Sequence, residues 1–131
     1  MCLYTTRRKK KAVTDIVCYK IMMINKRGEL CSLYRNNFKW IIGKVYNAGR
    51  AWTGSLKLGE VKEGYFHSYM YNPAYYPNIS LPSSLASGFD ICIYECVIPA
   101  GAYYYEGIHT DKLRGYASKS LKIIKKIYYY E

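Results

Sequence analysis

The chain has 131 residues, half of them hydrophobic, and a formal net charge of +11 at pH 7. Its length fits one domain, and its composition excludes a chain that is disordered throughout. No run of about 18 apolar residues occurs, and the basic residues of "MCLYTTRRKKK" follow the apolar ones. Because a transmembrane helix and a secretory signal need other patterns, we expect a cytoplasmic protein with no membrane partner.

The charge is concentrated at the two ends of the chain. Residues 1–11 carry five basic side chains and no acid, and residues 112–131 carry six basic side chains and one acid. Residues 63–111 hold five acids, nine of the 17 tyrosines and no lysine or arginine. Two interpretations stay open. The ends form a patch for a polyanion, or they are a solvated tail and ordinary exposed lysines.

The first half of the domain predicts strands joined by turns. Residues 15–24 are β-branched and apolar, which predicts a strand, and "NKRGEL" predicts a turn at Gly28. Residues 31–46 alternate loosely, and Gly43 suits a bulge or bend. The core candidates in this segment are Leu33, Phe38, Trp40, Ile42 and Val45.

The middle of the chain predicts loops around two strands. Residues 47–64 contain four glycines and predict a loop or ragged hairpin. Residues 65–71 predict a short aromatic strand, and three prolines in residues 72–83 predict an irregular surface loop. Residues 90–98, "DICIYECVI", are mostly apolar on both faces, which predicts a central strand.

The last part of the chain carries a tyrosine-rich strand and an ambiguous segment. "AYYYEG", residues 102–107, predicts a strand with Tyr103 and Tyr105 on one face and Tyr104 on the other. The segment "YASKSLKII" alternates like a strand, but the lysines and apolar residues of 119–128 also fit helical spacing. We prefer the strand.

Signals for catalysis, metals and cofactors are weak. An odd set of five scattered cysteines does not fit a disulfide framework, and no CxxC pair predicts a zinc site. Cys92 and Cys96 would lie about 13 Å apart on a strand, too far for a disulfide, so reduced cysteines are expected. His67 is expected to be structural and His109 to be exposed. We expect no metal and no cofactor.

Several segments occur in an order that is known from one family. They are "IVCYK", "SLYRNNFKWIIGKVY", "GYFHS", "YECVIPAGAYYYEG" and "GYASKSLKI". Over most of residues 1–124 this order resembles a family of small uncharacterised proteins of bacteriophages and gut Bacteroidales. The chain departs from it by inserting Tyr65 and lengthening the proline-bearing loop. The resemblance implies an α+β fold with a C-terminal strand, in a phage-encoded protein of the host cytoplasm or virion, and it implies no activity.

The same pattern also resembles ADP-ribosyltransferase-like folds. There an early strand carries a basic or histidine residue, a later strand a small polar motif, and a "VPxG" stretch precedes a catalytic acid. This resemblance implies Lys20 or Arg35, Ser68 and an acid after "IPAG" as the matching residues. Glu106 and Asp111 follow that stretch, but neither lies in a recognisable catalytic turn, so no catalytic residue is assigned.

Together these patterns predict an α+β fold. Residues 12–131 would form a single compact domain dominated by an antiparallel or mixed β-sheet with little helix, after a basic tail at residues 1–11. We expect a non-enzymatic binding or accessory protein that presents a protein–protein surface to a host or virion partner. Its interface candidates are Tyr69, Tyr71, Tyr75, Tyr76, Tyr103, Tyr104 and Tyr105.

Two alternatives remain, and the oligomeric state is not predicted. The first is an anion or nucleic-acid binder that uses both basic ends, with a steep salt dependence. Its candidates are Arg7, Arg8, Lys9, Lys10, Lys11, Lys119, Lys122, Lys125 and Lys126. The second is an ADP-ribosyltransferase-like fold with or without activity. The tyrosines of "AYYYEG" have no basic residue near them in sequence, which argues against a stacking platform for bases.

Overall fold

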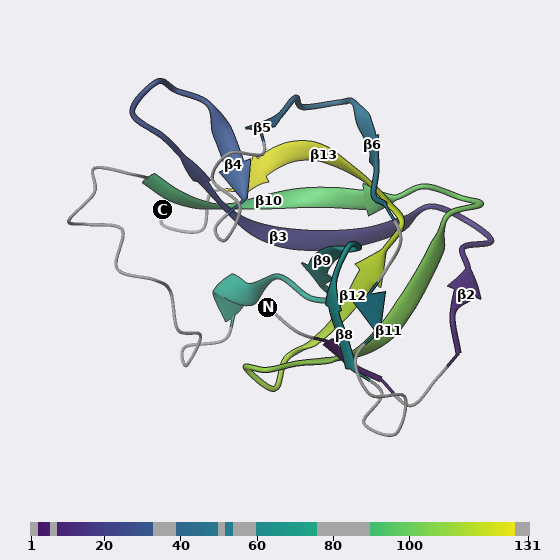
Figure 1. Cartoon of the computed structure of the whole chain (residues 1–131). Helices are drawn as coiled ribbons and strands as arrows, with labels where there is room; N and C mark the ends of the chain where they lie inside the picture. The colour runs from purple at the N-terminus through teal and green to yellow at the C-terminus, as the bar shows by residue number, and fades with distance from the viewer. Residues whose placement is uncertain are drawn as a thin grey trace.

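The computed structural model describes the chain at residues 3–5, 8–32, 39–49, 52–53, 60–75 and 90–127. These residues form strands and one short 3-10 helix, η1 (Figure 1). In chain order the elements are β1 (Leu3–Tyr4), β2 (Lys10–Lys11), β3 (Ile16–Ile24), β4 (Leu30–Ser32), β5 (Lys39–Trp40), β6 (Val45–Asn47), β7 (Trp52–Thr53), β8 (Glu60–Glu63), β9 (Phe66–Tyr69), η1 (Pro73–Tyr75), β10 (Asp90–Ile98), β11 (Tyr103–His109), β12 (Arg114–Ser118) and β13 (Ser120–Ile127).

The strands form one sheet whose main path has the order β6-β13-β10-β3-β9-β12-β11-β1-β8-β7. Off this path, β2 pairs with β11, and β4 pairs with β3 and β5. Every pairing in the described ranges is antiparallel. The prediction of a single compact domain dominated by an antiparallel sheet with little helix is confirmed. The α+β class is not confirmed, because η1, with three residues, is the one helix among the described residues. None of the helical structure described is long and apolar enough to cross a bilayer.

The strand β10 lies at the centre of the sheet, as its apolar sequence predicts. It pairs with β3 along its whole length, from Asp90 opposite Ile24 to Ile98 opposite Ile16, and with β13 on its other side. Alternate residues of a strand face opposite sides of the sheet, and the side chains of one face are buried. These are Cys92, Tyr94, Cys96 and Ile98.

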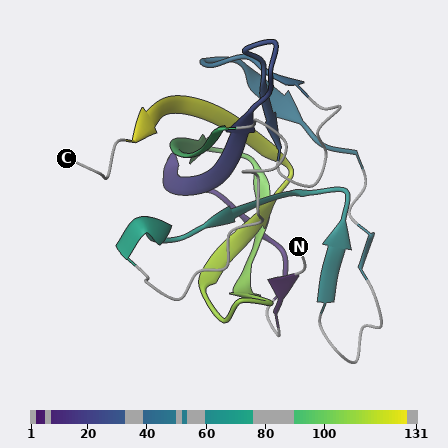
Figure 2. The ribbon, with the colours of Figure 1, turned by 90° about the vertical axis from the view of Figure 1, so that its left-hand side faces the viewer.

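The sheet curls around one main core. The core cluster joins residues of β3, β10 and β13 to Tyr116 of β12, and the half-buried Phe66 and Tyr104 pack against it. Figure 1 shows β3, β10 and β13 side by side, with the β11–β12 hairpin crossing below them, and the turned view in Figure 2 shows the curvature of β3 and β13. Trp40 closes the core from β5, its ring 4.9 Å from those of Tyr46 and Phe66.

The predicted core residues of 31–46 have mixed outcomes. Trp40 is confirmed, with 5% of its surface exposed. The predictions for Ile42 and Val45 are wrong, because 53% and 43% of their surfaces are exposed. Ile42 lies in the turn between β5 and β6, and β6 is an edge strand whose exposed face carries Val45. Leu33 and Phe38 lie outside the described residues.

Several local predictions are confirmed by the strands and turns. The strand predicted at residues 15–24 is β3, Ile16–Ile24, and the turn predicted at Gly28 is present. Gly43, which was predicted to suit a bulge or bend, lies in a turn, and φ is 79° at Gly28 and 88° at Gly43. Such positive angles favour glycine because it has no Cβ. The aromatic segment of residues 65–71 contains β9. The C-terminal segment is the strand β13 and not a helix.

The segment that was expected to be a basic tail contains strands. Within residues 1–11, β1 pairs with β11 and β8, and β2 pairs with β11. Residues 47–64, which were predicted to form a loop or ragged hairpin, contain β7 paired antiparallel with β8, with a shift of register. The proline-bearing loop at 72–83 begins with η1, and residues 76–83 lie outside the described part.

Ser118 on β12 gives a first testable prediction. It is fully buried, and its hydroxyl has no hydrogen-bond partner among the described residues. A buried polar group without a partner costs about 1–3 kcal/mol, so Ser118→Ala should raise the free energy of unfolding by about 1 kcal/mol in urea denaturation. Ser120→Ala is the matched control, because the Ser120 hydroxyl donates to Asn47 Oδ1 and its loss should lower stability. An equal loss of stability in both variants would contradict the conclusion that the Ser118 hydroxyl has no hydrogen-bond partner.

Candidate nucleic-acid interface

The pairing of β2 with β11 carries the N-terminal lysines onto the tyrosine-rich strand. Lys11 lies opposite Tyr103, and Lys10 lies opposite Tyr104. Beyond β2, the Ala12 amide donates to the Ala102 carbonyl oxygen at 2.8 Å and Ala12 accepts from the Gly101 amide at 2.7 Å. Because side chains alternate along a strand, the residue pair Lys11 and Tyr103 shares one face of this ribbon, and Lys10 faces the other side.

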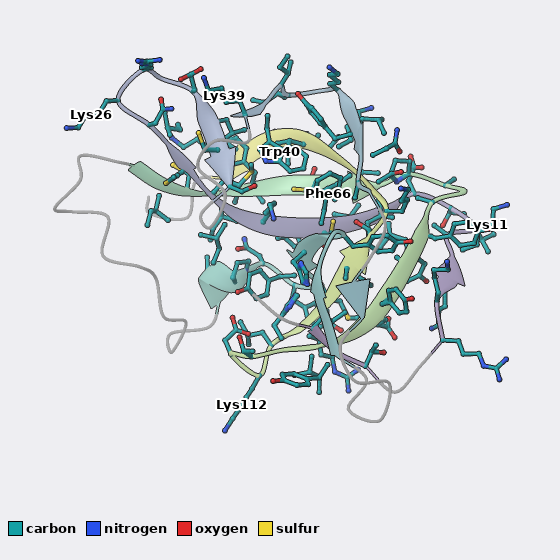
Figure 3. All side chains as sticks on the ribbon, in the orientation of Figure 1. Lys11, Lys26, Lys39, Trp40, Phe66 and Lys112 are labelled. Atoms are coloured by element: carbon teal, nitrogen blue, oxygen red, sulfur yellow. The ribbon has the colours of Figure 1, made fainter. Side chains whose placement is uncertain are left out.

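The ring of Tyr103 lies under two cations. Lys9 Nζ is 4.9 Å from the ring centroid and Lys11 Nζ is 6.0 Å from it, both within the range of a cation–π contact. Tyr103 is 45% exposed, and Arg8, Lys9 and Lys11 are exposed as well. Figure 3 shows Lys11 at the outer edge of the molecule, beside β2. We call Lys9, Lys11 and Tyr103 the Tyr103 cluster.

Lys10 and Tyr104 on the other side of the ribbon have different surroundings. Lys10 Nζ lies 3.8 Å from Glu106 Oε2, which offsets its charge locally. Tyr104 is half-buried against the main core, with its ring edge-on to Tyr116 at a centroid distance of 5.7 Å. Burial and the charge of Glu106 raise the pKa of Tyr116 to about 12, so its hydroxyl stays protonated at neutral pH. This side of β11 serves packing, whereas the Tyr103 cluster faces solvent.

The remaining interface tyrosines do not gather on one face. Tyr69 is 4% exposed and donates from its hydroxyl to Asp111 Oδ2 at 2.5 Å. Tyr105 is half-buried in a second cluster with Leu3 and Ala117. Tyr71 is 54% exposed, on the segment after β9. The side chain of Tyr75 and the whole of Tyr76 lie outside the described residues.

The C-terminal lysines begin beside the Tyr103 cluster and then move away along β13. The Lys119 amide donates to the Tyr103 carbonyl oxygen at 2.8 Å, while Lys119 Nζ donates to the carbonyl oxygens of Ala48 and Gly49. The other lysines follow the pairing of β13 with β10: Lys122 is half-buried opposite Val97, Lys125 is exposed opposite Glu95, and Lys126 is half-buried opposite Tyr94. Arg7 lies outside the described residues.

The prediction that His109 is exposed is wrong. His109 is 1% exposed, and its Nε2 lies 2.6 Å from the Ser68 carbonyl oxygen. It is the last residue of β11, and its ring packs edge-on against Tyr69 at 5.1 Å between centroids. The His67 ring on β9 lies 5.8 Å from that of His109. The hairpin turn after β11 therefore places this histidine inside the molecule.

Among the residues that the transferase resemblance implies, three make side-chain contacts within the fold, and Ser68 is buried. Lys20 Nζ donates to the His67 carbonyl oxygen at 2.8 Å, and Ser68 is 1% exposed. Glu106 faces Lys10, whereas Asp111 accepts from Tyr69. Arg35 lies outside the described residues. No three histidine, cysteine, aspartate or glutamate side chains gather as metal ligands in the described part of the chain.

Sequence reasoning placed the basic ends and the tyrosines on separate surfaces. The two basic residues over Tyr103 are more than 90 positions away in sequence, and the register that joins them depends on β2 pairing with β11. The sequence did contain one signal for this contact: basic residues at the alternate positions 9 and 11, and tyrosines at the alternate positions 103 and 105. It becomes informative only once that pairing is known.

Comparisons with known proteins do not assign the chain to a family. No protein-family model matches it, and neither a curated protein nor a solved structure is significantly similar to it.

Proposed function

We propose that this protein binds single-stranded nucleic acid and that the Tyr103 cluster is its contact surface. The observation that carries the proposal is the position of Lys9 and Lys11 beside the exposed ring of Tyr103. Single-strand binders combine aromatic rings, on which bases stack, with basic side chains that neutralise phosphates. A protein–protein surface made of the seven tyrosines is less well supported, because Tyr69 is buried and Tyr104 and Tyr105 are half-buried in packing.

In this arrangement, different side chains provide base stacking and phosphate neutralisation. The ring of Tyr103 is fixed on β11, which pairs with β12 on one side and with β2 on the other. The lysine stems are long and flexible, so the ammonium groups can turn from the ring to phosphates when a base stacks on it. Excess positive charge on the whole chain, +11, adds long-range attraction for a polyanion.

Loss of the ring should weaken binding without changing its electrostatic part. Stacking of one base on an aromatic side chain contributes about 1–3 kcal/mol, so Tyr103→Leu should lower the affinity about 5- to 150-fold. The dependence of affinity on salt should stay the same, because no phosphate contact is removed. Fluorescence anisotropy of a fluorescein-labelled oligothymidylate measures both quantities.

The matched control is Tyr71→Leu, which removes another exposed tyrosine, 54% exposed, on the segment after β9. We expect its affinity to equal that of the wild type. Equal losses in the two variants would show that stacking is not localised at Tyr103 and would contradict the proposed surface.

A further inference from the structure

Two cysteines face each other across the centre of the sheet. Cys18 of β3 and Cys96 of β10 are direct cross-strand partners in the antiparallel register. Both are fully buried, both are free thiols, and both belong to the main core. Cα atoms of directly opposed antiparallel residues lie about 4.5–5.5 Å apart, which is inside the range of about 4.4–6.8 Å that a disulfide bridges. The two strands therefore already hold these residues at bridging distance and on one face.

We propose that Cys18 and Cys96 are a redox-active pair that forms a reversible disulfide between β3 and β10. The other described cysteines lack such a partner: Cys92 lies opposite Met22, and Cys31 lies opposite Met23. The bond would join the two longest neighbouring strands, which pair along nine residues. It would therefore fix the centre of the sheet.

The surroundings of the pair favour one thiol as the nucleophile. The hydrogen bond with Cys96 lowers the pKa of the Cys18 thiol against the opposing effect of burial, and the charge of Lys20 also lowers it. Burial, together with the neighbouring Cys18, raises the pKa of Cys96 well above its ordinary value. Of the two thiols, Cys18 is therefore the one that loses its proton more easily. The Cys96 thiol contacts the Tyr94 carbonyl oxygen at 3.6 Å.

With hydrogen peroxide as the oxidant, the reaction balances in two steps. The Cys18 thiolate attacks one peroxide oxygen, the O–O bond breaks, and the departing hydroxide takes a proton to leave as water, which gives a sulfenic acid. The Cys96 sulfur then attacks the Cys18 sulfur, the S–O bond breaks, and the hydroxide leaves as a second water with the Cys96 proton. Two thiols and one peroxide thus give one disulfide and two waters. Because both thiols are buried, oxidant reaches them through transient opening of the sheet.

Peptide mapping of the full-length wild-type protein tests the pairing directly. Folded protein is treated with hydrogen peroxide, remaining thiols are blocked with iodoacetamide, and the chain is cut with trypsin and a glutamyl endoproteinase. Cleavage after Glu95 separates Cys92 from Cys96. The expected product is the peptide "AVTDIVCYK" linked to "CVIPAGAYYYE", which carry Cys18 and Cys96. Dithiothreitol should return both peptides to the unlinked form.

Stability gives a second readout. A bridge between residues this far apart in sequence restricts the unfolded chain, so oxidation should raise Tm by roughly 10 °C, and reduction should reverse the shift. Cys92→Ser should keep the linked peptide and the shift, whereas Cys96→Ser should lose both. If Cys96→Ser does not fold, the wild-type peptide map decides alone. Absence of the linked peptide, or a link through Cys92 or Cys31, would overturn the proposal.

Discussion

Replacing Gly115 by alanine is expected to lower the free energy of unfolding by about 3 kcal/mol or more. Gly115 is the second residue of β12, paired with Tyr69 of β9 on one side and Gly107 of β11 on the other. A Cβ on Gly115 would lie 2.5 Å from His109 Cδ2 and nearer still to His109 Nε2 and the Ser68 carbonyl oxygen. Because β12 is held on both edges, the strand cannot move aside to relieve this overlap.

Gly107→Ala should have an effect of the same size for a related reason. Its Cβ would lie 2.9 Å from the carbonyl carbon of Tyr4 and nearer still to the carbonyl oxygen. These atoms belong to the backbone of the chain beside β11, so no change of rotamer can remove the overlap. To relieve the overlap, β1 would have to move away from β11, with which it pairs.

The matched control is Gly49→Ala. No atom lies within 4 Å of a Cβ built at Gly49, and a surface substitution of this kind changes stability by about 0.5 kcal/mol or less. Urea denaturation followed by far-ultraviolet circular dichroism compares the three variants. A loss at Gly115 no larger than that at Gly49 would contradict the packing of the His109 ring against β12.

The second large effect concerns binding. Lys9→Glu combined with Lys11→Glu should lower the affinity for a single-stranded oligonucleotide about 100-fold or more at low salt, if each lost charged contact is worth about 1.4 kcal/mol or more. Both lysines lie over Tyr103, so the change places two carboxylates where the proposal puts phosphates. Folding should be little affected, because loss of exposed cation–π contacts removes only about 0.5–1 kcal/mol each.

The control for this variant changes the net charge by the same amount elsewhere. Lys26→Glu combined with Arg27→Glu alters the turn between β3 and β4, and Figure 3 shows Lys26 on the opposite side of the molecule from Lys11. We expect this control to weaken binding only a few-fold, through the long-range field. If both double variants weaken binding equally, net charge accounts for the affinity and the Tyr103 cluster is not the site.

The elements with strong local patterns could be predicted from the sequence. β3 and β10 are β-branched and apolar, and the predicted turn at Gly28 is present. These features depend on a few neighbouring residues, so the sequence contains most of the information that they need. The choice of a strand for β13 was also correct, but it followed from the family resemblance, because the local spacing fitted a helix as well.

Features that depend on strand pairing could not be predicted in the same way. The position of Lys9 and Lys11 over Tyr103, and of Cys18 opposite Cys96, follows from the registers of β2 with β11 and β3 with β10. The burial of His109 depends on Gly115 of β12, which has no side chain to overlap the histidine ring. These contacts join residues far apart in the chain, and no local pattern specifies their register. Short strands such as β1 and β2 carry little local signal.

The most direct test of the proposed function is the salt dependence of oligonucleotide binding by the wild-type protein. Single-strand binding changes with a slope of about −0.7 per phosphate contact in a plot of log affinity against log salt concentration. Contacts from Lys9 and Lys11 therefore predict a contribution of about −1.4 to the slope, which Lys9→Ala combined with Lys11→Ala should remove. No binding at low salt, or a slope that the double variant leaves unchanged, would contradict the account.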